Sequence, residues 1–192
     1  MPTTRLEAFS DGVLAIAITL LIIDVHVPEA HGNLGHRLGQ EWPSFVSYVI
    51  SFAIIGIIWV NHHALVQHVS AVDRTFLFLN LGLLLTVAWL PFPTAVLARY
   101  VRHGHDAKVA AALYGASMMT VGIAFIGLWS HLARTDAVRA PDFSAADARA
   151  SRRRTFVGPI VYGASVAVAF VSPVACLAIW AAIAVYFVVP LL

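Results

Sequence analysis

Two aspartates bracket the first apolar stretch of the chain, and they are the first candidates for chemistry. Asp11 and Asp24 enclose the run from Gly12 to Ile23, which has only 12 residues. A membrane-spanning helix needs about 20 residues, so a crossing here must extend over about 6–27 and take both carboxylates with it. An ionisable group at membrane depth costs about 3 kcal/mol and points to a functional role. We therefore expect this helix to face water or other protein over most of its surface.

A helical wheel at about 100° per residue separates two sides of this helix. Ile16, Thr19, Leu20 and Ile23 fall into one narrow stripe that is apolar except for a single hydroxyl. Asp11 falls on the opposite side, where we expect it to be buried against a neighbouring helix. Any buried helix face also repeats at i, i+4 and i+7, so the stripe alone leaves ordinary packing open.

The polar residues at the head of this helix could be a cap and an interface anchor. Asp11 lies about a turn and a half beyond Arg5, however, which is too deep for a cap. The two side chains also lie about 240° apart on the wheel and do not pair simply within one helix. We expect Arg5, Ser10 and Asp11 to join a buried polar network that positions the helix. The candidate partners on other helices are His62, His63 and Asn80.

The remaining ionisable residues give weaker signals. Adjacent histidines such as His62 and His63 point about 100° apart and cannot both face one ion from a regular helix. We therefore expect no metal site and no resident cofactor, although the 9 histidines could sense protons. Asp24 and His26 could form a mouth that concentrates cations, or could simply be solvated. The chain has no evident nucleophile or metal cluster, so we expect no enzymatic activity.

Composition indicates the environment of these residues. The chain has 192 residues, of which 60% are hydrophobic and 11% charged, against about 25% charged residues in soluble domains. An integral membrane protein in a lipid bilayer follows, with no room for a separate soluble domain. The formal net charge of +2 is too small to suggest nucleic acid as a partner.

The apolar runs predict an all-α membrane protein, with residues 1–192 forming a single six-helix transmembrane domain. Two prolines, Pro91 and Pro93, predict a kink in the third span. The loop over 133–154 could hold a short amphipathic helix, and the stretch over 28–41 reads as a polar loop. The predicted spans are about 6–27, 42–66, 75–98, 109–132, 155–171 and 174–189.

Orientation follows from the basic residues in the loops. Eight arginines fall on the side of the N-terminus, against four lysines and arginines on the other side. Basic loops are retained in the cytoplasm. We therefore expect both termini in the cytoplasm and the protein in the plasma membrane.

Arg5, Phe9, Ser10 and Asp11 spell R-x-x-x-F-S-D at the head of the first span. This motif resembles the signature of the transmembrane protein 175 family, the endolysosomal potassium channels of animals and their bacterial homologues. The resemblance is most specific over 5–24. It implies a cation channel that prefers potassium, with the first helix of each subunit lining a central pore. A chain with one copy of the motif resembles the bacterial homotetramers.

The resemblance also assigns roles within the stripe. Bulky apolar residues five, nine and twelve positions after the motif aspartate form constriction rings in the family, and here these are Ile16, Leu20 and Ile23. The threonine eight positions after it, implicated in selectivity, is Thr19. An apolar ring narrower than a hydrated ion dewets and closes the pore. Potassium sheds water more easily than sodium, so we expect a modest preference for potassium among monovalent cations.

A second interpretation stays open. A proton-coupled secondary transporter could use Asp11, His62 and His63 as a proton relay. Such folds usually carry internal repeats and broken helices at mid-membrane, and neither is evident here beyond Pro91 and Pro93. Saturating flux that needs a proton gradient would favour the transporter, and ohmic single-channel current would favour the channel.

Overall fold

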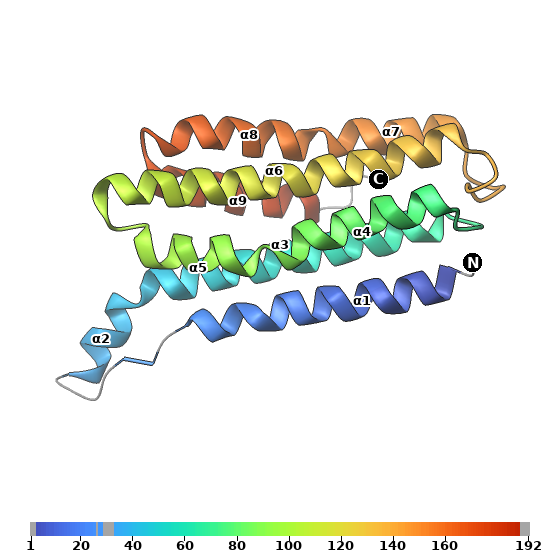
Figure 1. The fold of residues 1–192 in the computed structure, drawn as a ribbon. Helices are drawn as coiled ribbons and strands as arrows, with labels where there is room; N and C mark the ends of the chain where they lie inside the picture. The colour runs from blue at the N-terminus through green and yellow to red at the C-terminus, as the bar shows by residue number, and fades with distance from the viewer. Residues whose placement is uncertain (1–2, 26, 29–32, 189–192) are drawn as a thin grey trace.

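The computed structural model of the chain describes residues 3–25, 27–28 and 33–188. Over these residues the secondary structure is helical apart from one isolated bridge between Val69 and Arg139. Most of the helices run roughly along one long axis (Figure 1). In order, the elements are α1 (Thr3–Leu20), the short 3-10 helix η1 (Leu21–Asp24), α2 (Leu34–Gln40), α3 (Trp42–Gln67), α4 (Arg74–Ala88), α5 (Pro91–Tyr100), α6 (Gly104–Arg134), α7 (Ala145–Thr155), α8 (Val157–Ala169) and α9 (Pro173–Val188).

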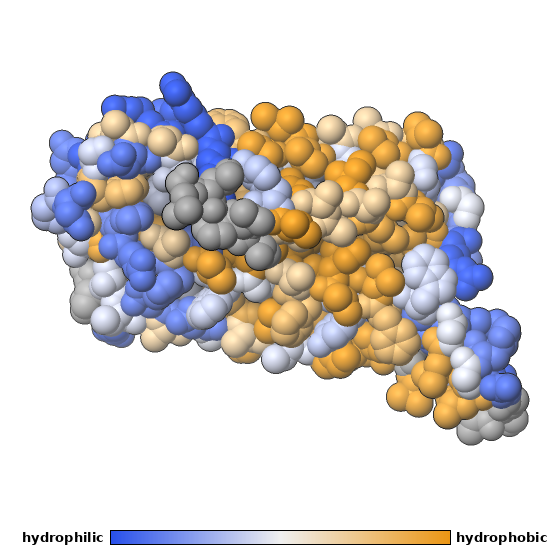
Figure 2. All heavy atoms as spheres, turned by 180° about the vertical axis from the view of Figure 1, so that it is seen from behind, coloured by the Kyte–Doolittle hydropathy of each residue, from blue (hydrophilic) through white to orange (hydrophobic). Residues whose placement is uncertain are grey.

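Four segments of the described chain are long and apolar enough to cross a membrane. They are Thr3–Asp24, Trp42–Gln67, Arg74–Tyr100 and Gly104–Arg134, and they lie where the first four spans were expected. Helices α8 and α9 lie at the fifth and sixth positions but have only 13 and 16 residues, fewer than the approximately 20 of a full crossing. Figure 2 shows a broad apolar surface flanked by hydrophilic ends, as a protein in a bilayer requires.

Local sequence explains where several helices begin and end. Asp73 caps α4 by accepting a hydrogen bond of 2.7 Å from the backbone N–H of Phe76. Pro91 has no N–H to continue α4, and the chain turns before α5 begins at that proline. The predicted kink is therefore present. A short helix, α7, occupies part of the long basic loop, and α2 lies in the stretch that was expected to be a polar loop.

Helix α6 is the central element of the bundle and contacts α4, α5, α7, α8 and α9. Its approach to α8 is close because glycine stands at the crossing. A Cβ at Gly122 would lie 2.5 Å from Cγ of Pro159. By contrast, α1 lies at one edge of the bundle (Figure 1) and packs mainly against α3, α4 and α5. Among the described residues, one long side of α1 is therefore largely uncovered.

Candidate functional site

The face that α1 turns toward its own subunit is regular. Leu6, Ser10, Leu14, Ala17 and, in η1, Leu21 are buried. Their spacing of three or four residues keeps them on one side of a helix. This face contacts α3 and α4, so the opposite side of α1 points away from the bundle.

The stripe identified in the sequence lies on that outward side. Ile16 is 61% exposed, Leu20 41% and Ile23 69%. Thr19 is exposed beside them, and its hydroxyl oxygen lies 2.9 Å from the carbonyl oxygen of Ala15, to which it donates. The hydroxyl proton is thus used within the helix, and the lone pairs of the oxygen remain available to a cation.

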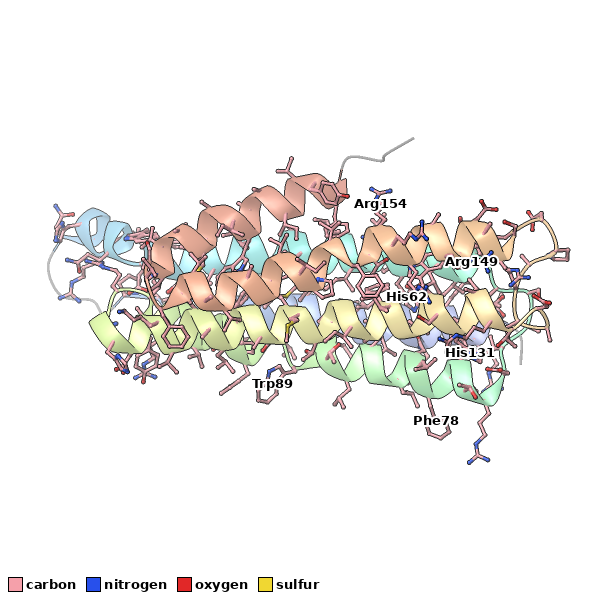
Figure 3. The ribbon with its side chains drawn as sticks, turned by 90° about the horizontal axis from the view of Figure 1, so that it is seen from above. His62, Phe78, Trp89, His131, Arg149 and Arg154 are labelled. Carbon is pink, nitrogen blue, oxygen red and sulfur yellow. The ribbon has the colours of Figure 1, made fainter. Side chains whose placement is uncertain are left out.

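A buried chain of hydrogen bonds joins α1 to α4 and α3. The side-chain nitrogen of Asn80 donates to Oγ of Ser10 at 3.0 Å, and Oδ1 of Asn80 lies 2.8 Å from Nε2 of His62. An amide oxygen can only accept, so Nε2 of His62 carries the proton. All three side chains are buried; His62 lies inside the bundle in Figure 3. The structure therefore brings together Ser10, His62 and Asn80 of the predicted network.

Asp11 differs from the prediction of a buried acid in a network with His62, His63 and Asn80. Its side chain is exposed in the subunit, and Oδ1 accepts a hydrogen bond of 2.9 Å from Nε1 of Trp59 on α3. His63 is exposed too: its ring stacks beside Trp59, with centroids 6.3 Å apart, and bonds Gln67 rather than Asp11. The physical reason is the rotation of α1 about its own axis. Because Ser10 points into the bundle, the next residue, Asp11, lies at the edge of the contact between α1 and α3.

Arg5 and Phe9 lie on the exposed side at the head of α1. Together with Arg74 and Phe78 of α4 they border a hollow of about 230 Å³ between the two helices. The guanidinium of Arg74 stands 5.7 Å from the centre of the Phe78 ring, and Phe78 projects away from the bundle (Figure 3). Asn80 borders the same hollow, but within the described part of the chain no hydrogen bond joins Arg5 to the buried Ser10–Asn80–His62 chain.

Asp24 lies at the far end of the first crossing. It borders a hollow of about 840 Å³ whose other polar walls include Glu41, Arg99 and Arg102. Side chains of both charge signs therefore line the hollow that Asp24 borders, and its role at a cation mouth stays a prediction. His26, the other residue proposed there, lies outside the described residues. Within the described part of the chain, no three His, Cys, Asp or Glu side chains gather closely enough to hold a metal ion.

Two features of the site were missed in the sequence. The first is Trp59, whose indole N–H bonds Asp11. The signal that could have pointed to Trp59 was its position one helical turn before His63. A second buried cluster joins three helices: Oγ of Ser51 lies 2.9 Å from both Oγ1 of Thr94 and the hydroxyl of Tyr114. Nothing in the local sequence pairs residues so far apart along the chain.

Comparisons with known proteins agree on one family. The family model described as the endosomal/lysosomal potassium channel TMEM175 matches residues 5–91. A potassium channel of Streptomyces collinus is 49% identical over 185 residues, covering 95% of this chain and 90% of that protein. The crystal structure of a lysosomal potassium-selective channel TMEM175 homologue from Chamaesiphon minutus superposes with a TM-score of 0.87 at 37% identity, covering 97% of this chain and 96% of that one. The endosomal/lysosomal proton channel TMEM175 of Mus musculus is 35% identical over 136 residues, which cover 66% of this chain but 27% of the mouse protein.

Proposed function

Because this chain belongs to the TMEM175 family, we propose that it forms a leak-type potassium channel whose pore is lined by the first helix of each subunit. The observation that carries the proposal is the uncovered stripe on α1. The helix buries its opposite face against α3 and α4 and leaves Ile16, Leu20 and Ile23 exposed. An outward apolar stripe on an edge helix fits a pore lining that other subunits complete.

A single α1 cannot enclose a pore, so the proposal requires several copies of the chain. We propose a homotetramer with four copies of α1 around the axis, on the strength of the resemblance to the bacterial members. The test is the mass of the particle in mild detergent, which should be about four times 20.7 kDa. A particle with the mass of one subunit would contradict this arrangement.

In the proposed pore, Ile16, Leu20 and Ile23 form apolar constrictions that close by dewetting. Thr19 turns oxygen lone pairs toward the permeating ion and replaces a little of its lost water. The buried Ser10–Asn80–His62 chain and the Trp59–Asp11 bond fix the rotation of α1, and with it the residues that face the axis. No cofactor and no catalytic group take part, and potassium with other monovalent cations is the cargo.

The placement in the membrane is part of the proposal. Six crossings require α8 and α9 to span a locally thinned region, since both are short. The arginine-rich end of the bundle, where α1 begins, faces the cytoplasm under the positive-inside rule. We propose the plasma membrane, with Arg5 and Asp11 toward the cytoplasmic side and Asp24 at the outer mouth.

A reversal potential tests the function. Purified protein is placed in a planar bilayer with potassium chloride on one side and equal sodium chloride on the other. Each tenfold preference for one monovalent cation displaces the reversal potential by about 59 mV. We expect a displacement in the potassium direction below that value, and we expect Ile16→Asn to reduce it because a polar ring no longer demands dehydration.

The matched control is Leu85→Asn, because Leu85 is also an exposed apolar residue but lies on α4. This variant should keep the reversal potential of the wild type. Equal effects of the two substitutions would show that α1 does not line the pore. A reversal potential that follows only an imposed proton gradient would instead support proton-coupled transport or proton conduction, the activity in the name of the mouse relative.

A further inference from the structure

A cavity that the proposed pore does not use lies between α3, α6, α7, α8 and α9. Its volume is about 250 Å³, it is partly open to the surface, and none of its described lining residues belongs to α1. Its walls are mostly aliphatic and aromatic side chains, including Ile54, Met118, Phe125 and Phe187. The volume falls just below the approximately 300–1,000 Å³ typical of pockets for whole drug-sized ligands. An apolar segment of a longer ligand fits such a space.

The basic lining residues of the cavity lie at one end, and the polar side chains of Asn61 and Tyr162 lie farther along it. His68, at the end of α3, lines it together with Ser151, Arg154 and Thr155 at the boundary of α7 and α8. Arg154 projects from that boundary on the side where α9 ends (Figure 3). No Asp or Glu lies among the described lining residues. The guanidinium of Arg154 lies at this end of the cavity and is a group that binds anions.

The length of the cavity matches one leaflet of a bilayer. Its lining runs along α3 from Ile54 to His68, which is about 21 Å at 1.5 Å per residue. Half of a bilayer, head groups included, is about 20–22 Å thick. Ile54 lies near the middle of α3 and His68 just beyond its end. The apolar end of the cavity thus lies at mid-membrane depth and Arg154 at the depth of the head groups.

We propose that this cavity binds an anionic phospholipid of the leaflet on the N-terminal side of the bundle. One acyl chain lies between α3, α6 and α8, and the phosphate accepts hydrogen bonds from Arg154. Basic pockets between membrane helices recognise anionic head groups in this way, and guanidinium groups bind phosphate with two parallel hydrogen bonds. The proposal goes beyond conduction: it depends on the membrane placement of α3 and α6 but not on the pore.

Lipid binding to the purified full chain tests the proposal without any current measurement. Delipidated protein is titrated in detergent with phosphatidylglycerol or phosphatidylcholine of the same acyl chains, and bound lipid is counted by native mass spectrometry. We expect wild type to prefer phosphatidylglycerol. Arg154→Gln should weaken phosphatidylglycerol binding about fivefold, because it removes one basic charge at the head group. Phosphatidylcholine binding should weaken less, because its choline cation already offsets the charge of the phosphate.

Two further variants separate the site from general surface charge. Arg153→Gln is the matched control, since Arg153 is exposed on the same helix and does not line the cavity; it should change binding less than twofold. Ala64 lines the cavity and is exposed, so a larger side chain can be introduced there. Ala64→Trp should fill part of the cavity and weaken binding of both lipids. Equal losses in Arg154→Gln and Arg153→Gln, or equal affinity of wild type for the two lipids, would overturn the proposal. Oleate binding as tightly as phosphatidylglycerol would overturn the assignment to a phospholipid.

Discussion

Replacing Asn80 with leucine isolates the contribution of the buried polar chain to holding α1. Leucine has the same branched shape and number of heavy atoms as asparagine and is somewhat larger, so the substitution removes two hydrogen bonds without opening a cavity. The bonds lost are those from Asn80 to Ser10 at 3.0 Å and between Asn80 and His62 at 2.8 Å. Both partner side chains are buried and are left without these bonds.

The expected size of the effect follows from what each orphaned group can do next. The hydroxyl of Ser10 can turn to a carbonyl of its own helix, as serine and threonine do inside helices, so its loss costs little. The ring N–H of His62 has no such alternative, and a buried unpaired donor costs about 1–3 kcal/mol. Hydrogen bonds between membrane helices average only about 0.6 kcal/mol, which favours the lower half of that range. We expect Asn80→Leu to lower the free energy of unfolding by about 1–2 kcal/mol, or the melting temperature by about 2–8 °C.

The assay is thermal unfolding of detergent-purified protein for the two single variants and the double variant. His62→Phe alone leaves the oxygen of Asn80 unpaired, whereas His62→Phe with Asn80→Leu replaces both partners by apolar groups. The double variant should therefore lose less stability than the sum of the single losses, by about 1–2 kcal/mol. Ser10→Ala should cost less than either single variant.

Strict additivity of the two single losses would refute the reasoning, and so would a melting temperature of Asn80→Leu within about 1 °C of wild type. Either result would mean that the apolar face formed by Leu6, Leu14 and Ala17, with the Trp59–Asp11 bond, holds α1 in place without the buried polar chain. The proposed control of α1 rotation by the polar chain would then be wrong.

Two further predictions concern packing and pH. Gly122→Ala should destabilise the protein by about 1–3 kcal/mol, because its Cβ would lie 2.5 Å from the rigid proline ring on α8. The control is Gly127→Ala on the same helix, whose Cβ would have its nearest contact at 3.4 Å and which should be neutral or stabilising. Equal melting temperatures of the two variants would contradict this prediction. The backbone N–H of Phe76, and then His131, lower the pKa of Asp73 from its ordinary value of 3.8. The ionised carboxylate therefore contributes its full share of the folding stability above about pH 3.8, and this contribution is lost as the pH falls through the lowered pKa. Between about pH 4 and pH 3 the melting temperature of wild type should fall more steeply than that of Asp73→Asn, and parallel curves would argue against the assignment.

Several parts of the fold could be predicted because they depend on neighbours along the chain. The positions of the four long helices follow from runs of apolar residues, and the break before α5 follows from Pro91, which has no N–H to give. The stripe of Ile16, Leu20 and Ile23 follows from the period of a helix. Helix α2 was missed because its single short segment is rich in glycine and polar residues.

The contacts between helices could not be predicted in the same way. Asp11 was expected to join a buried network with His62, His63 or Asn80. It bonds Trp59 instead, because the rotation of α1 against α3 depends on how their side chains interlock. The hydrogen bonds that join Ser51 to Thr94 and Tyr114 likewise depend on how separate helices pack against one another.

The sequence by itself determined that the chain is a helical membrane protein, which residues share the stripe on its first helix, and that polar groups lie at the head of that helix. These properties follow from composition and from a local period of 3.6 residues. Only the tertiary structure decided that the stripe points away from the subunit. Only it placed Asn80 between Ser10 and His62 and left a cavity with Arg154 at its mouth. Each of these depends on distances between segments far apart in the chain, which are set by the packing of whole helices and not by the residues next to them.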